Sequence, residues 1–401
     1  MQAIENDRSS LIESEHDYIL NTYKRLPIVI DKAVGCRVID INGNEYLDFL
    51  AGIAVNALGH SHPRIINAVQ EQIFRYMHVS NYFYQDTQIK LAQNLCRMSG
   101  FSKVFFTNSG TEATEAAIKL IRRWGLKNKK TNILAFSGGF HGRTYGALSI
   151  MDKPRYKDTM GPFLPNTQVI PLNDIETLMS SVNSDTAGVV LEFIQGEGGI
   201  SILTPEFVEM LMELKSVHNF LLIADEVQCG IGRSGRLFAF EHWNIRPDVI
   251  IMAKGMGGGL PLGGLLVDEN LSDIWETGMH GTTYGGNAVA CATGMVVLEE
   301  LESGLMEHVQ SMGEYFRREL EKIHATNPKK VLQVRGLGLM CGLLLSFDAG
   351  LLVNALLERK AIANAASGNV LRMVPPLIVG KTEINEFVTI LQKALDSIDI
   401  Q

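Results

Sequence analysis

An acid and a lysine in the middle of the chain each follow a short apolar run. Residues 220–224 (FLLIA) precede Asp225, and residues 249–253 (VIIMA) precede Lys254. Both runs are too short for a typical helix and are typical of buried parallel strands. In an open α/β sheet, ligands bind beyond the carboxyl ends of the strands. We therefore expect Asp225 and Lys254 to face one crevice, beside the glycine-rich stretch 255–259.

Such a pair suits carbonyl chemistry on a nitrogen-containing ring. Burial lowers the pKa of a lysine, so that its neutral amine can attack a carbonyl carbon. A nearby carboxylate can hold a protonated ring nitrogen, and pyridoxal phosphate needs both groups. Taken singly, Asp225 is more often a turn or cap residue and Lys254 a solvated lysine. Two buried strands that deliver them beside a glycine-rich loop favour the cofactor site.

The segments LLIADEVQCGIGRSG and DVIIMAKGMGGGLPLGG resemble the core of the class III pyridoxal-phosphate aminotransferases. Within that family they are most similar to the acetylornithine aminotransferases, and the match extends over nearly the whole chain. The resemblance implies a fold-type I transferase in which Lys254 holds pyridoxal 5'-phosphate and Asp225 binds the ring nitrogen. It also places Glu226, Val227 and Gln228 against the cofactor.

The stretch TNSGTEA follows an apolar run and opens a helical pattern. A helix N-terminus offers unpaired N–H groups and the positive end of the helix dipole to a phosphate. Ser109 and Thr111 add hydroxyls, and Gly110 lets the backbone approach a ligand. A simple helix cap looks similar and is favoured from the motif alone. The resemblance assigns this stretch to the cofactor phosphate, and it assigns Phe140, in the loop GGFHGRT, to the face of the cofactor.

Three charged residues are expected to bind the substrates. Arginine grips a carboxylate in a bidentate fork, and the resemblance assigns Arg143 to the α-carboxylate of the amino donor. The stretches EFIQGEGG and VLRMVPP resemble a family loop and strand in which Glu197 masks Arg372 until a dicarboxylate arrives. A static salt bridge is the alternative. Phe193 replaces the family's proline, so we expect the entry to this loop to differ.

The stretch HGTTYGGN resembles a family loop that reaches the neighbouring subunit. By that resemblance Thr283 contacts the cofactor phosphate of the partner and Thr282 lies near substrate. The implied assembly is a homodimer with shared active sites. Ile53 stands where ornithine aminotransferases carry a tyrosine, and its apolar side chain favours an acylated donor over free ornithine.

Composition narrows the class of protein. The 401 residues suffice for a large core and two domains. With 36 Lys and Arg against 44 Asp and Glu, the formal net charge is −8. The sequence contains no block of basic residues, which argues against nucleic acid or an anionic membrane as a partner. The start lacks an apolar signal-peptide core, and five scattered cysteines show no metal spacing. We expect a cytoplasmic protein without a metal site.

The apolar runs predict the elements that position these groups. Strand candidates alternate with amphipathic helices, which predicts an α/β fold: a mostly parallel seven-stranded sheet with helices on both faces, plus a smaller α+β domain. We expect an N-terminal segment at 1–50 that packs on the small domain, a large cofactor-binding domain at 51–302 and the small C-terminal domain at 303–401. The strand candidates are 104–106, 133–136, 168–170, 188–191, 221–223, 249–251 and 264–267, and the main helix candidates are 11–23, 63–77, 87–98, 111–125, 205–218, 286–301, 305–325, 349–359 and 383–397.

Residues and resemblance together predict an aminotransferase of arginine biosynthesis. It moves the distal amino group of N2-acetylornithine to 2-oxoglutarate, giving N-acetylglutamate 5-semialdehyde and glutamate. Succinylornithine, ornithine, 4-aminobutyrate and N-succinyl-diaminopimelate are alternative donors. A non-catalytic relative that only binds a ligand is the alternative from another class. Such chains usually lose the lysine or the acid, whereas this chain has both.

Overall fold

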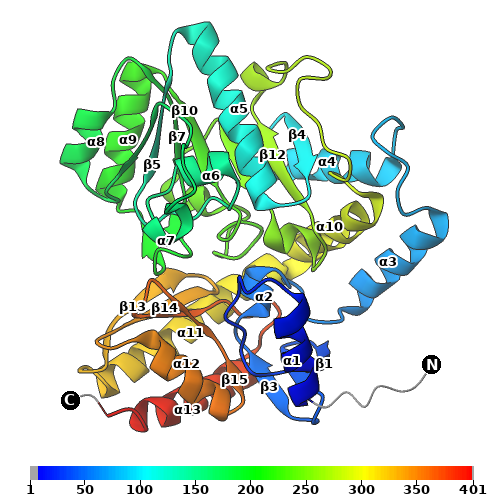
Figure 1. Ribbon diagram of the computed structural model, residues 1–401, viewed down its shortest axis with the longest axis vertical. Helices are drawn as coiled ribbons and strands as arrows, with labels where there is room; N and C mark the ends of the chain where they lie inside the picture. The colour runs from blue at the N-terminus through cyan, green and yellow to red at the C-terminus, as the bar shows by residue number, and fades with distance from the viewer. Residues whose placement is uncertain (1–7, 400–401) are drawn as a thin grey trace.

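A seven-stranded sheet forms the centre of the larger part of the molecule in the computed structural model, which describes residues 8–399 (Figure 1). The strand order is β4-β12-β11-β10-β7-β5-β6, and β12 alone runs antiparallel to its neighbours. The strands are β4 (Lys103–Thr107), β5 (Asn132–Phe136), β6 (Thr167–Ile170), β7 (Thr186–Leu191), β10 (Leu221–Asp225), β11 (Val249–Met252) and β12 (Gly263–Val267). Each coincides with a predicted run, so the mostly parallel sheet is confirmed.

Helices cover both faces of this sheet, as continuously apolar strands require. Alternate side chains of β10 enter two separate cores. Leu221 and Ile223 pack with α5, whereas Leu222 and Ala224 belong to the core on the opposite face, with α9. The principal helices around the sheet are α3 (Pro63–Arg75), α4 (Asp86–Ser99), α5 (Gly110–Asn128), α8 (Ile175–Ser181), α9 (Pro205–His218) and α10 (Ala288–Glu300).

The register of the two central strands brings the acid and the lysine to the same edge. β10 and β11 run parallel, and Asp225 pairs with Ile251. Lys254 follows three residues after Ile251, just past the end of β11. The crevice expected beyond the strand ends is therefore where these two side chains emerge.

A smaller unit lies below the large sheet in Figure 1. Its antiparallel sheet has the order β13-β14-β17-β16, and a second sheet joins β1, β2 and β3 to β15 from the C-terminal part of the chain. The elements are β1 (Ile30–Val34), β2 (Arg37–Asp40), β3 (Glu45–Asp48), η4 (Leu301–Leu305), α11 (Met306–Thr326), β13 (Val331–Leu337), β14 (Met340–Leu345), α12 (Ala349–Glu358), β15 (Ala361–Ile362), β16 (Asn364–Ala366), β17 (Val370–Met373) and α13 (Lys381–Asp396). The domain boundaries near residues 50 and 302 remain a prediction.

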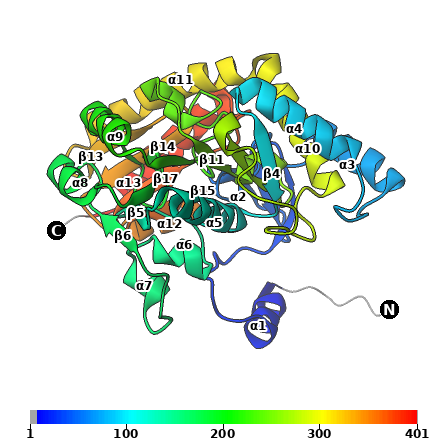
Figure 2. The same cartoon turned by 90° about the horizontal axis from the view of Figure 1, so that it is seen from above.

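The N-terminal helix and several short elements differ from the expectation. α1 spans Arg8–Tyr18 instead of 11–23, and it stands apart from the body of the molecule (Figure 2). The elements without a periodic apolar pattern were not predicted, because tertiary contacts decide such short segments. They are α2 (Ala51–Ala54), α6 (Tyr145–Ser149), α7 (Pro154–Lys157), α8, β8 (Ile194–Gln195), β9 (Ser201–Ile202), β15, β16 and the 3-10 helices η1 (Ala239–Trp243), η2 (Lys254–Gly257) and η3 (Glu269–Leu271). Across residues 8–399, no helix is both long and apolar enough to cross a membrane.

Candidate active site

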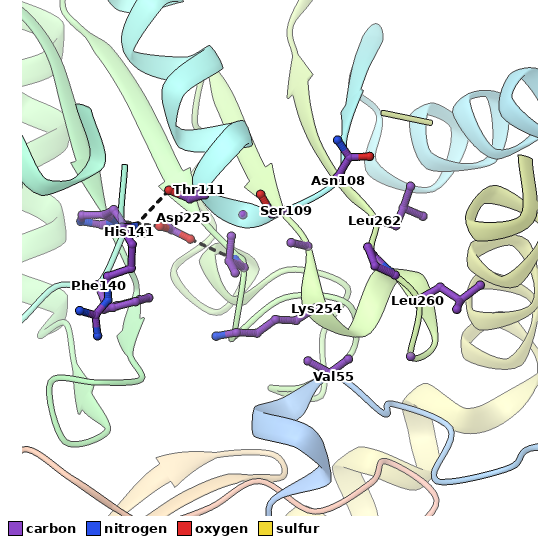
Figure 3. Close-up of a pocket in the computed structure, with 17 residues that line it drawn as sticks. Val55, Asn108, Ser109, Thr111, Phe140, His141, Asp225, Lys254, Leu260 and Leu262 are labelled. Carbon is purple, nitrogen blue, oxygen red and sulfur yellow. Dashed lines mark hydrogen bonds and ion pairs between the residues drawn. The ribbon is translucent and has the colours of Figure 1, made fainter. Parts of the chain in front are cut away.

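The carboxyl edge of the large sheet opens into a cavity of about 420 Å³ (Figure 3). Asp225 and Lys254 both line it, so the two groups expected to face one crevice share one pocket. The other walls come from the N-terminus of α5, the loop after β5 and the loop after η2. Within the described part of the chain, no group of three or more His, Cys, Asp or Glu side chains could hold a metal ion.

Asp225 is almost fully buried and is held by two neighbours. The backbone N–H of Val227 donates to Oδ1 at 3.1 Å, and His141 Nδ1 lies 2.7 Å from Oδ2. Burial alone would lower the pKa of His141, but the hydrogen bond and the charge of Asp225 raise it above its ordinary value. His141 therefore holds the Asp225 carboxylate in one orientation at the wall of the pocket.

A second buried carboxylate, Glu192, stands behind this pair. It accepts the backbone N–H of Phe140 at 2.9 Å and that of Gly196 at 3.2 Å, so it joins the loops that follow β5 and β7. Burial, followed by the charge of Asp225, raises the pKa of Glu192 to about 7. His141 and Glu192 were both missed in the sequence. They stand inside quoted motifs, but no spacing indicates that they surround Asp225.

Lys254 emerges into the pocket beneath Asp225 (Figure 3). Its backbone has a φ of 44°, which is uncommon for a residue with a side chain. Burial and, second, the charge of Arg372 lower the pKa of its amine below the ordinary value. The lowered pKa increases the fraction of neutral amine at neutral pH, as attack on a carbonyl carbon requires.

The N-terminus of α5 is both capped and open to an anion. The side chain of the N-cap residue Ser109 accepts the N–H of Glu112 at 3.3 Å, which is the helix cap considered from the sequence, and Glu112 accepts the N–H of the preceding residue Asn108 at 2.6 Å. Among residues 8–399, the N–H groups of Gly110 and Thr111 have no acceptor, and both residues line the cavity. Cap and anion site therefore coexist.

Arg143 lies between two aromatic rings at the mouth of the cavity. Its guanidinium carbon is 3.6 Å from the ring centroid of Tyr156 and 5.5 Å from that of Phe140. Cation–π contacts of this kind hold the side chain without neutralising it. The described chain pairs no carboxylate with Arg143, so its charge is available to a substrate. Tyr156 was not predicted, because it lies outside the loop that carries Arg143.

Glu197 and Arg372 form the ion pair predicted from the sequence. Arg372 Nη1 donates to Glu197 Oε1 at 2.5 Å, with the arginine side chain 1% and the glutamate side chain 24% exposed. Burial would raise the pKa of Glu197, but the charge and hydrogen bond of Arg372 lower it. The charges of both residues also act on Lys254, so the pair lies beside the pocket.

Two residues predicted to contact the cofactor point their side chains elsewhere. Glu226 accepts the N–H groups of Ala239 at 2.8 Å and Phe240 at 3.0 Å, so its carboxylate is directed into the protein interior. Gln228 Oε1 accepts a hydrogen bond from Arg372 Nη1 at 3.1 Å. Val227, by contrast, lines the cavity as expected.

The two threonines of the HGTTYGGN loop lie outside the lining of this cavity. Asn108 Nδ2 donates to Thr282 Oγ1 at 3.1 Å, which holds the loop beside the N-terminus of α5. Thr283 is the next residue along this loop. The contact predicted for Thr283 is with a neighbouring subunit and remains a prediction.

Phe193 fits its position through aromatic packing. It is fully buried, with ring centroids 5.2 Å from Trp243 and 6.3 Å from Phe240. Its carbonyl accepts the N–H of Leu203 at 3.2 Å. Four residues later, Glu197 still reaches Arg372, so the loop keeps its ion pair without proline.

Known proteins match this chain along almost its entire length. The family model described as aminotransferase class III matches residues 18–395. The chain belongs to the class III aminotransferases. The acetylornithine aminotransferase of Caldanaerobacter subterraneus subsp. tengcongensis is 44% identical to this chain. The match covers 97% of this chain and 100% of the relative.

Two solved structures show the same fold as this class III aminotransferase. The acetylornithine aminotransferase of Elizabethkingia anophelis superposes with a TM-score of 0.88 at 34% identity, covering 98% of this chain and 100% of that chain. The ornithine aminotransferase of Toxoplasma gondii ME49 superposes with a TM-score of 0.93 at 30% identity, covering 98% and 95%. The predicted fold-type I transferase is confirmed.

The pocket of this class III aminotransferase fits the phosphate, the ring nitrogen and the aldehyde of pyridoxal phosphate. The unpaired N–H groups of Gly110 and Thr111 suit a phosphate, Asp225 suits a ring nitrogen, and Lys254 suits the aldehyde carbon. Phe140 and Val227 line the same cavity and can cover the ring. All these groups lie around one cavity, so a single ligand can contact them together.

Proposed function

We propose that this class III aminotransferase uses pyridoxal 5'-phosphate to move the distal amino group of N2-acetylornithine to 2-oxoglutarate. The products are N-acetylglutamate 5-semialdehyde and glutamate, and the reaction belongs to arginine biosynthesis. The observation that carries the proposal is the shared cavity of Lys254 and Asp225 beside two substrate arginines. The 44% identical relative carries the name acetylornithine aminotransferase, which supports this choice of donor.

Each side chain of the pocket has a role in this proposal. The bound cofactor supplies an electron sink that stabilises negative charge on the substrate carbon. Lys254 Nζ would hold the cofactor and then, as a free amine, would take the proton from the substrate carbon that carries the amino group and pass it to the cofactor. The Asp225 carboxylate, oriented by His141, keeps the ring nitrogen protonated.

Two arginines divide the recognition of carboxylates in this proposal. Arg143, which has no carboxylate partner in the described chain, binds the α-carboxylate of the donor. Arg372 is masked by Glu197 while the donor presents its distal amine, which needs no arginine. When 2-oxoglutarate enters, Glu197 turns aside and Arg372 binds the second carboxylate. Without a substrate carboxylate, a buried and unpaired Arg372 would be destabilising, and the ion pair with Glu197 avoids this cost.

The test is a donor panel with 2-oxoglutarate as acceptor. Single-turnover rates would be measured with N2-acetylornithine, N2-succinylornithine, ornithine, 4-aminobutyrate and N-succinyl-diaminopimelate. We expect the acetylated donor to react fastest. A faster reaction with any other donor would reassign the substrate while leaving the reaction class intact. Lys254→Ala serves as the control, because full turnover by that variant would refute the chemistry itself.

We further propose a cytoplasmic homodimer in which the neighbouring subunit completes each active site. Large apolar side chains are exposed on α3 and on the segment that follows it, including Phe74 at 88%, Tyr82 at 93% and Tyr84 at 100%. Exposed apolar patches of this kind mark protein–protein contacts. Tyr284, next to Thr283, is also exposed, at 61%. A second copy that covers this surface would bring its own Thr283 loop to the site.

A further inference from the structure

The guanidinium group of Arg372 is held by a neighbour that no motif indicates. Asn364 on β16 stands directly opposite Arg372 on β17 in the antiparallel register. Arg372 Nε donates to Asn364 Oδ1 at 3.0 Å. From the other side, Arg372 Nη1 donates to Gln228 Oε1 at 3.1 Å. Two neutral amides thus fix the plane of the guanidinium group independently of Glu197.

The backbone around Glu197 is pinned as well. Lys153 Nζ donates to the carbonyl of Glu197 at 3.2 Å, and Arg335 Nη1 donates to the carbonyl of Gly199 at 3.0 Å. Exchange of the Glu197 carboxylate for a substrate carboxylate therefore requires only rotation of the glutamate side chain. Arg372 keeps its place throughout, because its two amide contacts involve neither group.

We propose that Asn364 is a positioning residue that presents Arg372 to the carboxylate of 2-oxoglutarate that Arg143 does not bind, an inference that rests on the proposed function. With Nε held by Asn364, the Nη1 and Nη2 edge is left for a bidentate carboxylate. No acceptor for Nη2 exists among residues 8–399. A neutral amide suits this role, because it orients the guanidinium group without neutralising the charge that the substrate needs. An aspartate at position 364 would orient the group but cancel its charge.

The test measures binding of inert ligands to the holoenzyme by calorimetry. Glutarate requires both arginines, whereas pentanoate, of equal chain length, requires Arg143 alone. Asn364→Ala should weaken glutarate about tenfold, because one charge-assisted hydrogen bond no longer orients the guanidinium group. Pentanoate affinity should change by less than about twofold. In turnover, KM for 2-oxoglutarate should rise by about the same tenfold factor, with a much smaller change in kcat.

Two further variants separate positioning from strand pairing. Asn364→Asp keeps an acceptor but adds a negative charge, so it should weaken glutarate at least as much as Asn364→Ala and again spare pentanoate. This variant carries the test if Asn364→Ala fails to fold. Ala365→Ser, on the exposed face of β16, is the matched control and should resemble wild type. Equal losses for both ligands would show a merely structural role and overturn the inference.

The inference and the proposed function fail in different ways. Wild-type protein that transaminates 2-oxoglutarate, together with Asn364 variants of unchanged glutarate affinity, overturns the inference alone. Wild-type holoenzyme that binds glutarate no better than pentanoate overturns both, because Arg372 then contributes nothing to recognition of the second carboxylate.

Discussion

At the scale of single residues, each reactive group of the pocket is tuned by a neighbour from another loop. His141 orients Asp225, Tyr156 stacks on Arg143, and Arg372 lowers the pKa of Lys254 together with burial. The lysine is the most sensitive of these groups, since only its neutral form attacks a carbonyl. The pKa of Lys254 therefore depends in part on a cation, Arg372, that does not line the cavity.

The lowered pKa of Lys254 predicts how cofactor capture depends on pH. An amine is neutral above its pKa, so a lowered pKa moves the rise in capture rate to lower pH. Mixing pyridoxal phosphate with cofactor-free protein between about pH 6 and about pH 9 should give rates that begin to rise at lower pH than those of a free lysine side chain. The rates would be followed by absorbance in a stopped-flow instrument.

Arg372→Leu provides the comparison for this profile. Removal of the cation, with Glu197 left unpaired, should raise the pKa of Lys254 and shift the capture profile to higher pH. Identical pH profiles for the wild type and Arg372→Leu would contradict the prediction.

At the scale of elements, the short turn α2 is wound in the opposite hand to every other helix near the pocket. Ala51, Gly52, Ile53 and Ala54 have φ values of 50°, 63°, 65° and 63°. Left-handed backbone costs roughly 1–2 kcal/mol for a residue other than glycine. Asp48 stabilises the start of the turn by accepting the N–H of Ala51 at 2.9 Å. The next residue after the turn, Val55, lines the cavity, so this strained element borders the active site.

Ile53→Gly should stabilise the folded protein. A β-branched residue in the left-handed region is strained by about 1–3 kcal/mol, and glycine removes this strain. Glycine also raises the conformational entropy of the unfolded chain, which offsets about 0.5–1 kcal/mol of that gain. The free energy of unfolding should therefore rise by about 1 kcal/mol, measured by chemical denaturation. Ile53→Val keeps the β-branch and should give no gain. A destabilised glycine variant would show that packing of the Ile53 side chain outweighs the backbone strain.

At the scale of the whole molecule, an apolar surface lies on α3 and on the segment that follows it. In Figure 1, α3 extends away from the body of the molecule, and the exposed aromatic segment follows it. Burying such a surface against a second copy stabilises a dimer by the hydrophobic effect. The proposed dimer therefore links assembly to completion of the site.

Tyr84→Asp should dissociate the proposed dimer and weaken cofactor binding. A charge at this fully exposed tyrosine would be buried unpaired in the interface, which costs several kcal/mol. Sedimentation velocity should show the smaller species, and dialysis should remove more cofactor from it. Leu126→Glu is the control, because Leu126 is also exposed, at 80%, but lies on α5. An intact dimer in the Tyr84 variant would place the interface elsewhere.

Local patterns were sufficient for most of the large sheet and for the residues that carry the chemistry. The strands are short apolar runs and the helices are periodic, so both are visible within a window of a dozen residues. The turn between β2 and β3 is likewise formed within a few residues, and Gly43 adopts a positive φ of 79° there. α1 and the short turns carry no such pattern, so the bounds predicted for α1 were wrong and the short turns were not predicted.

Local sequence patterns were enough to place the reactive groups relative to the strands and helices. They placed an acid after one buried strand, a lysine after the next, and a phosphate-binding motif at the start of a helix. The side chains that surround these groups could be seen only in the folded chain. Asp225 meets His141 from 84 residues away, and Arg372 meets Gln228 from 144 residues away. The carboxylate of Glu226, which was expected to contact the cofactor, instead accepts the backbone N–H groups of Ala239 and Phe240 in the interior. The physical reason is that strand character follows from local apolar periodicity, whereas hydrogen-bond partners depend on how distant loops converge at the edge of the sheet.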